Sequence, residues 1–371
     1  MHFVCSQAEL ATALAVVGRA APTRPSQPIL ATVLIEGVAA SGHIRLTGFD
    51  LHLGIQTDVA ATINTPGKTA VSLKLLSDIV SHLPKDGPLT VDTQGKQIIL
   101  KTTCGEYKIN CQDPEDYPDL PSVDAQGIAF PHAVMLQALK GVLYAVSIDE
   151  SKQLLTGMCF TIGKQIEAAA TDGHRLSILT APSSDSESDH EDIRVVIPGK
   201  ALRELGVLLK EQPEDIRFAY AKGQAVFQVG SQVLTTRLLE GNYPEYRKLL
   251  PASFKTHATV NRTALIAALN RVAVLANQHN NVVKTALTGD RAEIAAEAQD
   301  VGSGSETIAM TLEGDEITMA FNVAYLLDAL KAFGSESVVL SCNAPTTPVI
   351  LRPINDVGER TSLIMPVQIR V

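Results

Sequence analysis

Apolar side chains recur along the chain at intervals that predict amphipathic helices. In residues 8–20, 133–145 and 263–276, an apolar residue is followed by others four and seven positions later. This spacing places the apolar residues on one stripe of a helix. The stripes consist of Leu10, Leu14 and Val17; Met135, Leu139 and Val142; and Leu265, Leu269 and Val272. Each segment is therefore expected to be a helix that packs one face on a core.

A second helical pattern recurs with the same period. It covers residues 72–83, 198–209 and 322–333, where Leu76, Leu202 and Leu326 occupy matching positions. Ser72 and Asn322 are suited to cap the first turn of a helix, and Pro198 is suited to the start of one. Both helices thus recur about every 125 residues, which indicates internal repeats.

Alternating apolar segments between the helices, such as residues 43–55, are typical of strands. A Tyr-Pro pair at Tyr117 and again at Tyr243 follows the last strand of the first two repeats. Each repeat therefore reads as β-α-β-β-β twice, with two helices on one face of an antiparallel sheet. The expected fold is α+β, with tandem domains over residues 1–124, 125–253 and 254–371 joined by short links at 122–127 and 252–257.

Composition fits this picture and restricts the function. The 371 residues are 45% apolar and 19% charged, which allows real cores and argues against disorder. The net charge of −9 argues against a protein that grips nucleic acid with a strongly basic surface. Part of this charge belongs to an acidic loop, residues 183–192, which holds five acids and no Lys or Arg.

The cysteines and the amino terminus add two expectations. The five cysteines have no C-x-x-C spacing, and Cys104 and Cys111 would lie on opposite faces of a regular strand. Zinc binding and disulfides are therefore not expected. The first residues lack a basic region and an apolar core of a signal peptide, and no segment approaches a membrane span. We expect a cytosolic protein with no membrane partner.

The segment 170–179, ATDGHRLSIL, contains the strongest candidate for chemistry. Asp172 beside His174 could be a general base with its orienting carboxylate, or a pair of metal ligands. The alternative is a turn at Asp172 and Gly173 that joins two strands. Asp50 occupies the matching position one repeat earlier and has no His-Arg pair after it, which favours an architectural turn.

Five segments in order along the chain resemble the bacterial DNA sliding clamps, the beta subunits of DNA polymerase III. They are RPSQPIL (24–30), ATDGHRL (170–176), GNYPEYRKLLP (241–251), FNVAYLLDAL (321–330) and LIMPVQIR (363–370). The resemblance implies a non-catalytic processivity factor with no cofactor, no metal and no catalytic residue. It also implies a head-to-tail homodimer whose six domains form a ring around duplex DNA.

The resemblance implies roles for residues outside the turn. The dimer interface would include Tyr107, Ile109, Val274 and Leu275. Duplex DNA would pass residues on or beside the helices that line the hole and on one loop, namely Arg24, Lys74, Lys140, Lys152, Gln153 and Lys200. Gln153 stands where the family can carry an aromatic residue, which weakens that expected DNA contact.

The resemblance also implies a cleft between the second and third domains. This cleft would bind short linear peptides of the replicative polymerase catalytic subunit, the clamp loader, other polymerases and repair proteins. The matching residues are Leu155, Thr171, Gly173, His174, Arg175, Leu176, Pro244, Lys248, Leu249, Leu363, Ile364 and Met365. Lys248 replaces a common Arg, Ser362 replaces a frequent aromatic residue, and the chain continues past Met365 as an extended tail.

Two other functions remain compatible with the residues alone. A hydrolase or metal enzyme would be built around Asp50, Asp172 and His174, although the chain lacks the G-x-S-x-G, H-E-x-x-H and P-loop motifs. A repeat protein that binds peptides without encircling DNA would share the predicted fold.

Overall fold

The computed structural model describes residues 1–22, 24–37, 41–85, 87–121, 127–183, 192–211, 216–278, 280–298, 301–356 and 358–368. The expected link at 122–126, most of the acidic loop and the last three residues lie outside this part of the chain. The described residues form two compact units. The first unit contains Met1–His132 and Arg203–Leu238, and the second contains Ala133–Leu202 and Leu239–Val371.

The order of the elements confirms three repeats of the pattern β-α-β-β-β-β-α-β-β-β. The first repeat consists of β1 (His2–Ser6), α1 (Gln7–Gly18), β2 (Thr32–Gly37), β3 (His43–Phe49), β4 (Leu53–Thr65), β5 (Gly67–Ser72), α2 (Leu73–His82), β6 (Pro88–Gln94), β7 (Gln97–Thr102) and β8 (Gly105–Gln112). The second consists of β9 (Ile128–Phe130), α3 (His132–Val142), β10 (Gly157–Ile162), β11 (Gln165–Thr171), β12 (Arg175–Pro182), β13 (Ile193–Pro198), α4 (Gly199–Glu211), β14 (Ile216–Ala221), β15 (Gln224–Val229) and β16 (Gln232–Arg237).

The third repeat has the same order. It consists of β17 (Thr256–Asn261), α5 (Arg262–Ala276), β18 (Val282–Thr288), β19 (Arg291–Ala298), β20 (Gly302–Glu313), β21 (Ile317–Asn322), α6 (Val323–Ala332), β22 (Ser337–Cys342), β23 (Val349–Pro353) and β24 (Glu359–Ile364). The two compact units divide the second repeat between them. The expected domain ends at residues 124 and 253 stay a prediction.

The helices form where the apolar stripes and the caps predict them. Leu10, Leu14 and Val17 of α1 are buried, as are Leu265, Leu269 and Val272 of α5. Each fully buried Leu or Val contributes about 1.5–3 kcal/mol relative to an exposed one. The Asn322 side chain accepts a hydrogen bond from the Ala324 amide at 2.9 Å, and the Ser72 hydroxyl accepts one from the Leu75 amide. Both predicted caps are confirmed.

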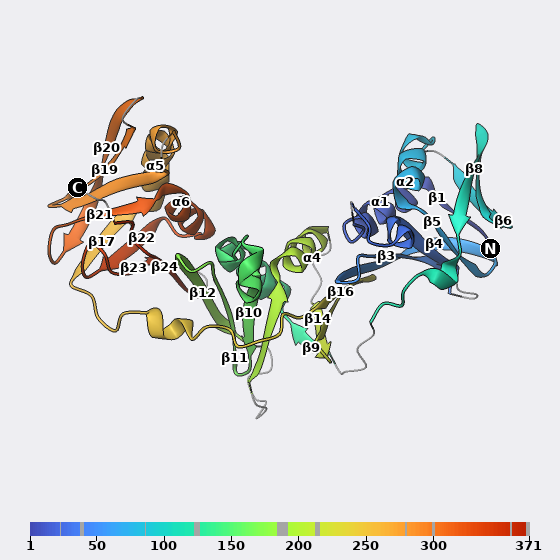
Figure 1. The fold of residues 1–371 in the computed structure, drawn as a ribbon, viewed down its shortest axis with the longest axis horizontal. Coiled ribbons are helices and arrows are strands. Elements are labelled where there is room, and N and C mark those ends of the chain that lie inside the picture. Colours follow the sequence, from blue (N-terminus) through green and yellow to red (C-terminus); the bar gives the residue numbers. More distant parts are fainter. Residues whose placement is uncertain are drawn as a thin grey trace. The chain divides into compact units, whose positions relative to one another are not determined.

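Each unit is built on one antiparallel sheet of 12 described strands. In the first unit, α1 and α2 pack side by side on one face of the sheet, as Figure 1 shows. The strand order is β1-β6-β7-β8-β5-β2-β3-β4-β16-β15-β14-β9. In the second unit, α5 and α6 pack side by side in the same way, and the order is β13-β10-β11-β12-β24-β23-β22-β17-β20-β19-β18-β21.

Consecutive repeats join by the same pairing in both units. The fourth strand of one repeat pairs antiparallel with the last strand of the next, as β4 with β16 and β12 with β24. Gly54 lies opposite Thr235 in the first junction, and Leu176 lies opposite Leu363 in the second. Each sheet therefore continues from one repeat into the next, and these junctions position the sites described below.

Candidate functional site

The turn between β11 and β12 is organised by one carboxylate. Asp172 Oδ1 accepts hydrogen bonds from the backbone amides of His174 and Arg175 at 2.9 and 3.0 Å. The Thr171 hydroxyl donates to the Arg175 carbonyl at 2.6 Å and accepts from the Gly173 amide at 3.1 Å. Gly173 has a φ of +95°, a conformation that disfavours residues with a Cβ. The sequence thus specifies a rigid turn that exposes Gly173 and His174.

The same carboxylate-centred turn occurs one repeat earlier, at Asp50. Asp50 Oδ1 accepts from the amides of His52 and Leu53 at 2.9 and 2.6 Å. The second oxygen of Asp172 accepts from Arg175 Nε at 3.0 Å. The His174 ring instead stacks on Tyr325, with ring centroids 6.3 Å apart. Asp172 therefore has a structural role, and the geometry does not support a His-Asp catalytic pair.

Arg175 is fixed by groups from several elements. Its NH1 donates to Asp328 Oδ2 at 2.6 Å, and its guanidinium carbon lies 4.5 Å from the Tyr325 ring centroid and 5.3 Å from that of Tyr144. Its side chain is only 11% exposed. The sequence analysis missed these partners, although the spacing of Tyr325 and Asp328 on one helix places both on one face. Arg175 joins the turn to α6.

An apolar floor lies beside this turn. Two predicted cleft residues, Leu176 and Leu363, are buried in one cluster with Tyr243 and Tyr246. Leu155 is half-buried and packs against this cluster. The Tyr243 hydroxyl accepts a hydrogen bond from the Thr171 amide at 3.2 Å, and burial raises the pKa of this phenol. The floor is therefore built by the junction of β12 with β24 and by the segment after β16.

Further half-buried side chains pack against the same cluster and extend the apolar surface. They are Leu154, Leu239, Leu250 and Phe254. The sequence analysis did not assign these residues to the site. The sequence marks each of them only as an apolar residue beside a predicted loop. Because such residues are common on any domain surface, they could not be assigned to the site from the sequence.

The predicted rim residues lie at the surface. Met365 follows β24, and its amide donates to the His174 carbonyl at 2.9 Å, which brings the two together. Met365 is 37% exposed. Pro244, Lys248 and Leu249 are exposed on the segment that Tyr243 and Tyr246 anchor.

Two predicted residues face the core instead of a surface. Ile364 is fully buried within the core of the third repeat, because neighbouring residues of a strand point to opposite faces of the sheet and Leu363 takes the cleft side. Ile109 of β8 is only 3% exposed. The Ile364 side chain therefore points away from the predicted cleft, and its place in the cleft stays a prediction that rests on its backbone. Ile109 can contribute to an interface only through its backbone.

The residues predicted to meet DNA are exposed. Lys74 and Lys200 are each the second residue of a helix, α2 and α4, as their matching sequence positions predict. Lys140 is exposed near the end of α3, and Arg24 is exposed after α1. Lys152 differs, because its Nζ donates to the Asp172 carbonyl at 3.3 Å. Lys152 and the exposed Gln153 therefore belong to the rim of the turn.

The predicted interface residues Tyr107, Val274 and Leu275 lie beside two open strand edges. Residues 105–110 of β8 pair with β7 and with no second strand among the described residues. Likewise, residues 302–309 of β20 pair only with β19 in the described part. Tyr107 is 43% exposed on β8 and Val274 is 66% exposed on α5. A Cβ on Gly304 of β20 would come within 2.9 Å of Leu275, which places Leu275 over the edge of β20.

Metal and thiol chemistry find no support in the described residues. No group of three or more His, Cys, Asp or Glu among them could hold a metal ion. All five cysteines are free, and burial raises the pKa of Cys5 to about 12 and that of Cys342 to about 11. No helix in the described part is long and apolar enough to span a membrane.

Three repeats of one α+β pattern, built on antiparallel sheets, define the class, a protein of three like domains. Sequence models of the three domains of the DNA polymerase III beta subunit match in order: the N-terminal domain at residues 1–121, the central domain at 129–245 and the C-terminal domain at 247–368. The chain therefore belongs to the DNA polymerase III beta subunit family.

Relatives with a similar sequence and structure agree over the full length. The chain is 39% identical to the beta sliding clamp of Synechococcus elongatus over 376 residues, and 38% identical to that of Synechocystis over 391 residues, with 100% of each chain covered. Among solved structures, the DNA polymerase sliding clamp of Bacillus subtilis superposes with a TM-score of 0.94 at 28% identity. The alignment covers 100% of both chains.

Proposed function

We propose that the protein is a sliding clamp, a non-catalytic ring that encircles duplex DNA and tethers the replicative polymerase to it. Two chains would associate head to tail, so that six like domains close the ring. Membership of the DNA polymerase III beta subunit family supports a role as a clamp for the replicative polymerase. The protein would act in the cytoplasm, at the replicating DNA, with no cofactor.

One observation carries the proposal of a closed dimer. The fourth strand of a repeat pairs with the last strand of the following repeat at both junctions within the chain. By the same rule, residues 302–309 of β20 in the third repeat have no partner from a following repeat among the described residues, and β8 of the first repeat is the unused last strand. An open strand edge presents unpaired amides and carbonyls that favour pairing with another chain. β20 of one chain would therefore pair with β8 of its partner.

Side chains at these edges support the same pairing. Tyr107 lies on β8, and Val274 and Leu275 lie beside β20. Exposed apolar side chains at an open edge would be covered when the two edges meet, which adds hydrophobic stabilisation to the backbone hydrogen bonds. Because the contacting surfaces differ, the interface is heterologous, and a heterologous interface that closes by rotation forms a ring.

A closed ring would allow a protein of net charge −9 to stay on DNA without a strongly basic surface. A ring holds DNA by topology, so it needs only scattered positive charges on its inner surface. Lys74, Lys140 and Lys200, all carried by helices, would supply them, together with Arg24. We expect the protein to stay on nicked circular duplex DNA after loading by its clamp loader and to leave when the circle is cut. Retention that is equal on circular and linear DNA would contradict encirclement and favour a peptide-binding repeat protein.

Replacing Lys74, Lys140 and Lys200 together by Gln should weaken the salt-dependent attraction to DNA without changing the ring. Each lost phosphate contact lowers the slope of log K against log salt by about 0.9 for duplex DNA. Titration of DNA at several salt concentrations measures the slope. A control that replaces Lys101, Lys222 and Lys284, which are exposed away from the helices, should leave the slope unchanged. Equal slopes for the two triple variants would show that these three helices do not contact DNA.

The cleft at the junction of β12 and β24 would bind the peptides of polymerases, the clamp loader and repair proteins. Apolar walls with donors at the rim suit a short peptide that carries aliphatic side chains. Among the matching residues, Leu155, Leu249 and Met365 would contact the peptide, while Leu176 and Leu363 form the floor. The turn from Thr171 to Arg175 would present His174 and the exposed Gly173.

His174→Ala and Met365→Ala should each weaken binding of a peptide from the carboxyl end of the replicative polymerase. Truncation of a side chain at the centre of such a site costs about 1–2 kcal/mol, or about fivefold to thirtyfold in Kd. Isothermal titration calorimetry measures the change, and Asp290→Ala, at an exposed position of the same unit, is the control. An unchanged Kd would place His174 and Met365 outside the peptide site.

A further inference from the structure

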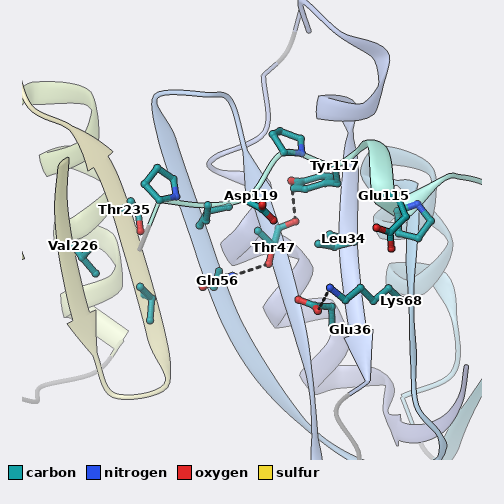
Figure 2. Close-up of a pocket in the computed structure, with 15 residues that line it drawn as sticks. Leu34, Glu36, Thr47, Gln56, Lys68, Glu115, Tyr117, Asp119, Val226 and Thr235 are labelled. Atoms are coloured by element: carbon teal, nitrogen blue, oxygen red, sulfur yellow. Dashed lines mark hydrogen bonds and ion pairs between the residues drawn. The ribbon is translucent and has the colours of Figure 1, made fainter. Parts of the chain in front are cut away.

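A cavity opens on the face of the first unit, where β4 pairs with β16. It has a volume of about 730 Å³ and is lined by β2, β3, β4, β5, β15 and β16 and by the segment 114–121. Figure 2 shows this segment crossing over the face of the sheet, with Tyr117 and Asp119 above the strands. The volume falls within the range of sites that hold small ligands or peptide side chains. No role of the beta subunit family described above uses this cavity.

The cavity occupies the place that the apolar floor takes in the second unit. The two positions correspond because Asp50 and Asp172 organise the same turn and because β4–β16 and β12–β24 pair in the same register. Three polar side chains of the first unit stand where the second unit has apolar ones: Thr47 for Ala169, Gln56 for Ile178 and Thr235 for Leu363. The β12–β24 junction is packed with apolar side chains, whereas the β4–β16 junction has a cavity with polar side chains at these three positions.

Hydrogen bonds fix the polar wall of this cavity. Gln56 Nε2 donates to the Thr47 hydroxyl at 3.1 Å, and the buried Tyr117 hydroxyl donates to the Thr47 carbonyl at 3.2 Å. A Cβ on Gly54 would come within 2.7 Å of Leu120, so the absence of a side chain at Gly54 leaves room for the covering segment. The wall is therefore preorganised, as the dashed lines in Figure 2 indicate.

The charge of the lining is negative. Lys68 Nζ lies 2.9 Å from Glu36 Oε1, and Glu115 and Asp119 also line the cavity. The ion pair with Glu36, and then the charges of Glu115 and Asp119, raise the pKa of Lys68. The lining thus has three carboxylates for one ammonium group. A cation that enters meets an attractive potential, while an anion or the phosphates of DNA are repelled.

We propose that this cavity binds a basic peptide segment of a partner protein, in which Lys or Arg alternates with aliphatic residues. The carboxylates of Glu115 and Asp119 are exposed and would pair with the basic side chains. Leu34, Leu120, Val226 and Val233 supply apolar surface for the aliphatic ones. The half-buried Gln56, whose Nε2 already donates to Thr47, offers its side-chain carbonyl to the peptide backbone. The site lies in the first unit and does not depend on the proposed cleft in the second.

Methyl NMR of the full chain with labelled Leu and Val locates the binding. The probe is the peptide acetyl-Leu-Lys-Leu-Arg-Leu-amide, and the comparison peptide has Gln in place of Lys and Arg. We expect the methyl signals of Leu34 and Val226 to shift with the basic peptide and not with the neutral one. Signals of Leu155 and Leu363 in the proposed cleft report the competing location. Shifts confined to them, or equal binding of the neutral peptide, would overturn the proposal.

A charge variant then tests the recognition. Glu115→Gln with Asp119→Asn should raise the Kd of the basic peptide about threefold to tenfold, since exposed ion pairs contribute modestly. The matched control, Asp290→Asn with Glu293→Gln, removes two exposed carboxylates from the second unit and should change nothing. Spermidine is a second comparison ligand, because it carries positive charges but no aliphatic side chains. If the first variant leaves the Kd unchanged, or if spermidine binds as tightly as the peptide, no peptide site exists here.

Discussion

Val274→Asp combined with Leu275→Asp is expected to convert a dimer of twice 39.5 kDa into a monomer at micromolar concentration. Leu275 lies over the open edge of β20, and its neighbour Val274 is 66% exposed. Covering a carboxylate with an apolar interface costs several kcal/mol if no partner charge is present. The proposed ring contains this interface twice, so the variant should open both closures. Size-exclusion chromatography with light scattering measures the mass.

A matched variant separates loss of the interface from a general effect of a new surface charge. Ile148 is 95% exposed and belongs to none of the elements of the proposed interface, β8, α5 and β20, so Ile148→Asp should leave the mass unchanged. The double variant should keep its circular dichroism spectrum, because neither residue is fully buried. A dimeric double variant would show that β8 and β20 do not meet, and the proposed ring would lose its main support.

The helices and the repeats could be predicted from the sequence because their signals are local. A stripe such as Leu265, Leu269 and Val272 specifies a helix by spacing alone. Asn322 marks the start of α6 because its side chain caps the first turn of that helix. The period of about 125 residues then shows that the same unit recurs. The matched turns at Asp50 and Asp172 could be predicted for the same reason, since each depends on one side chain and the next few amides.

The details of the sites depend on contacts between residues far apart in the chain. The pairing of Arg175 with Asp328 spans 153 residues, and no local pattern indicates it. Strand register decided that Leu363 belongs to the apolar floor and Ile364 to the core, because adjacent residues point to opposite faces. The cavity in the first unit arises where Thr47, Gln56 and Thr235 replace apolar residues, and this substitution becomes visible only when the two junctions are compared.

The comparison of the junctions also has a physical lesson. Both junctions share the strand pairing, the carboxylate turn and a buried Tyr that bonds to the sheet, Tyr117 in one and Tyr243 in the other. These shared features hold the repeats together. The side chains on the covered face differ, with Thr47 and Thr235 in the first junction where the second has Ala169 and Leu363, and the same backbone pairing forms with either set.

Arg175→Ala should destabilise the second unit by about 3 kcal/mol, because it removes a side chain that is only 11% exposed together with its hydrogen bonds to two carboxylates and its contacts with two aromatic rings. Arg175 pairs with Asp172 and Asp328 and stacks on Tyr325 and Tyr144. For a unit of this size, the loss corresponds to a fall in Tm of roughly 10 °C. The turn that exposes His174 would lose its link to α6, so affinity for the polymerase peptide should fall as well.

Two control variants define what Arg175 contributes. Arg175→Lys keeps the charge but lacks the planar group that can face two rings and two carboxylates together, so it should recover only part of the stability. Arg45→Ala breaks a similar two-contact pair with Asp58 at a site where Arg45 is 42% exposed, and it should cost less than about 1 kcal/mol. Differential scanning calorimetry compares the three. Equal stability of Arg175→Ala and Arg45→Ala would show that the aromatic and carboxylate contacts of Arg175 do not hold the turn, and the peptide site would then rest on the apolar floor alone.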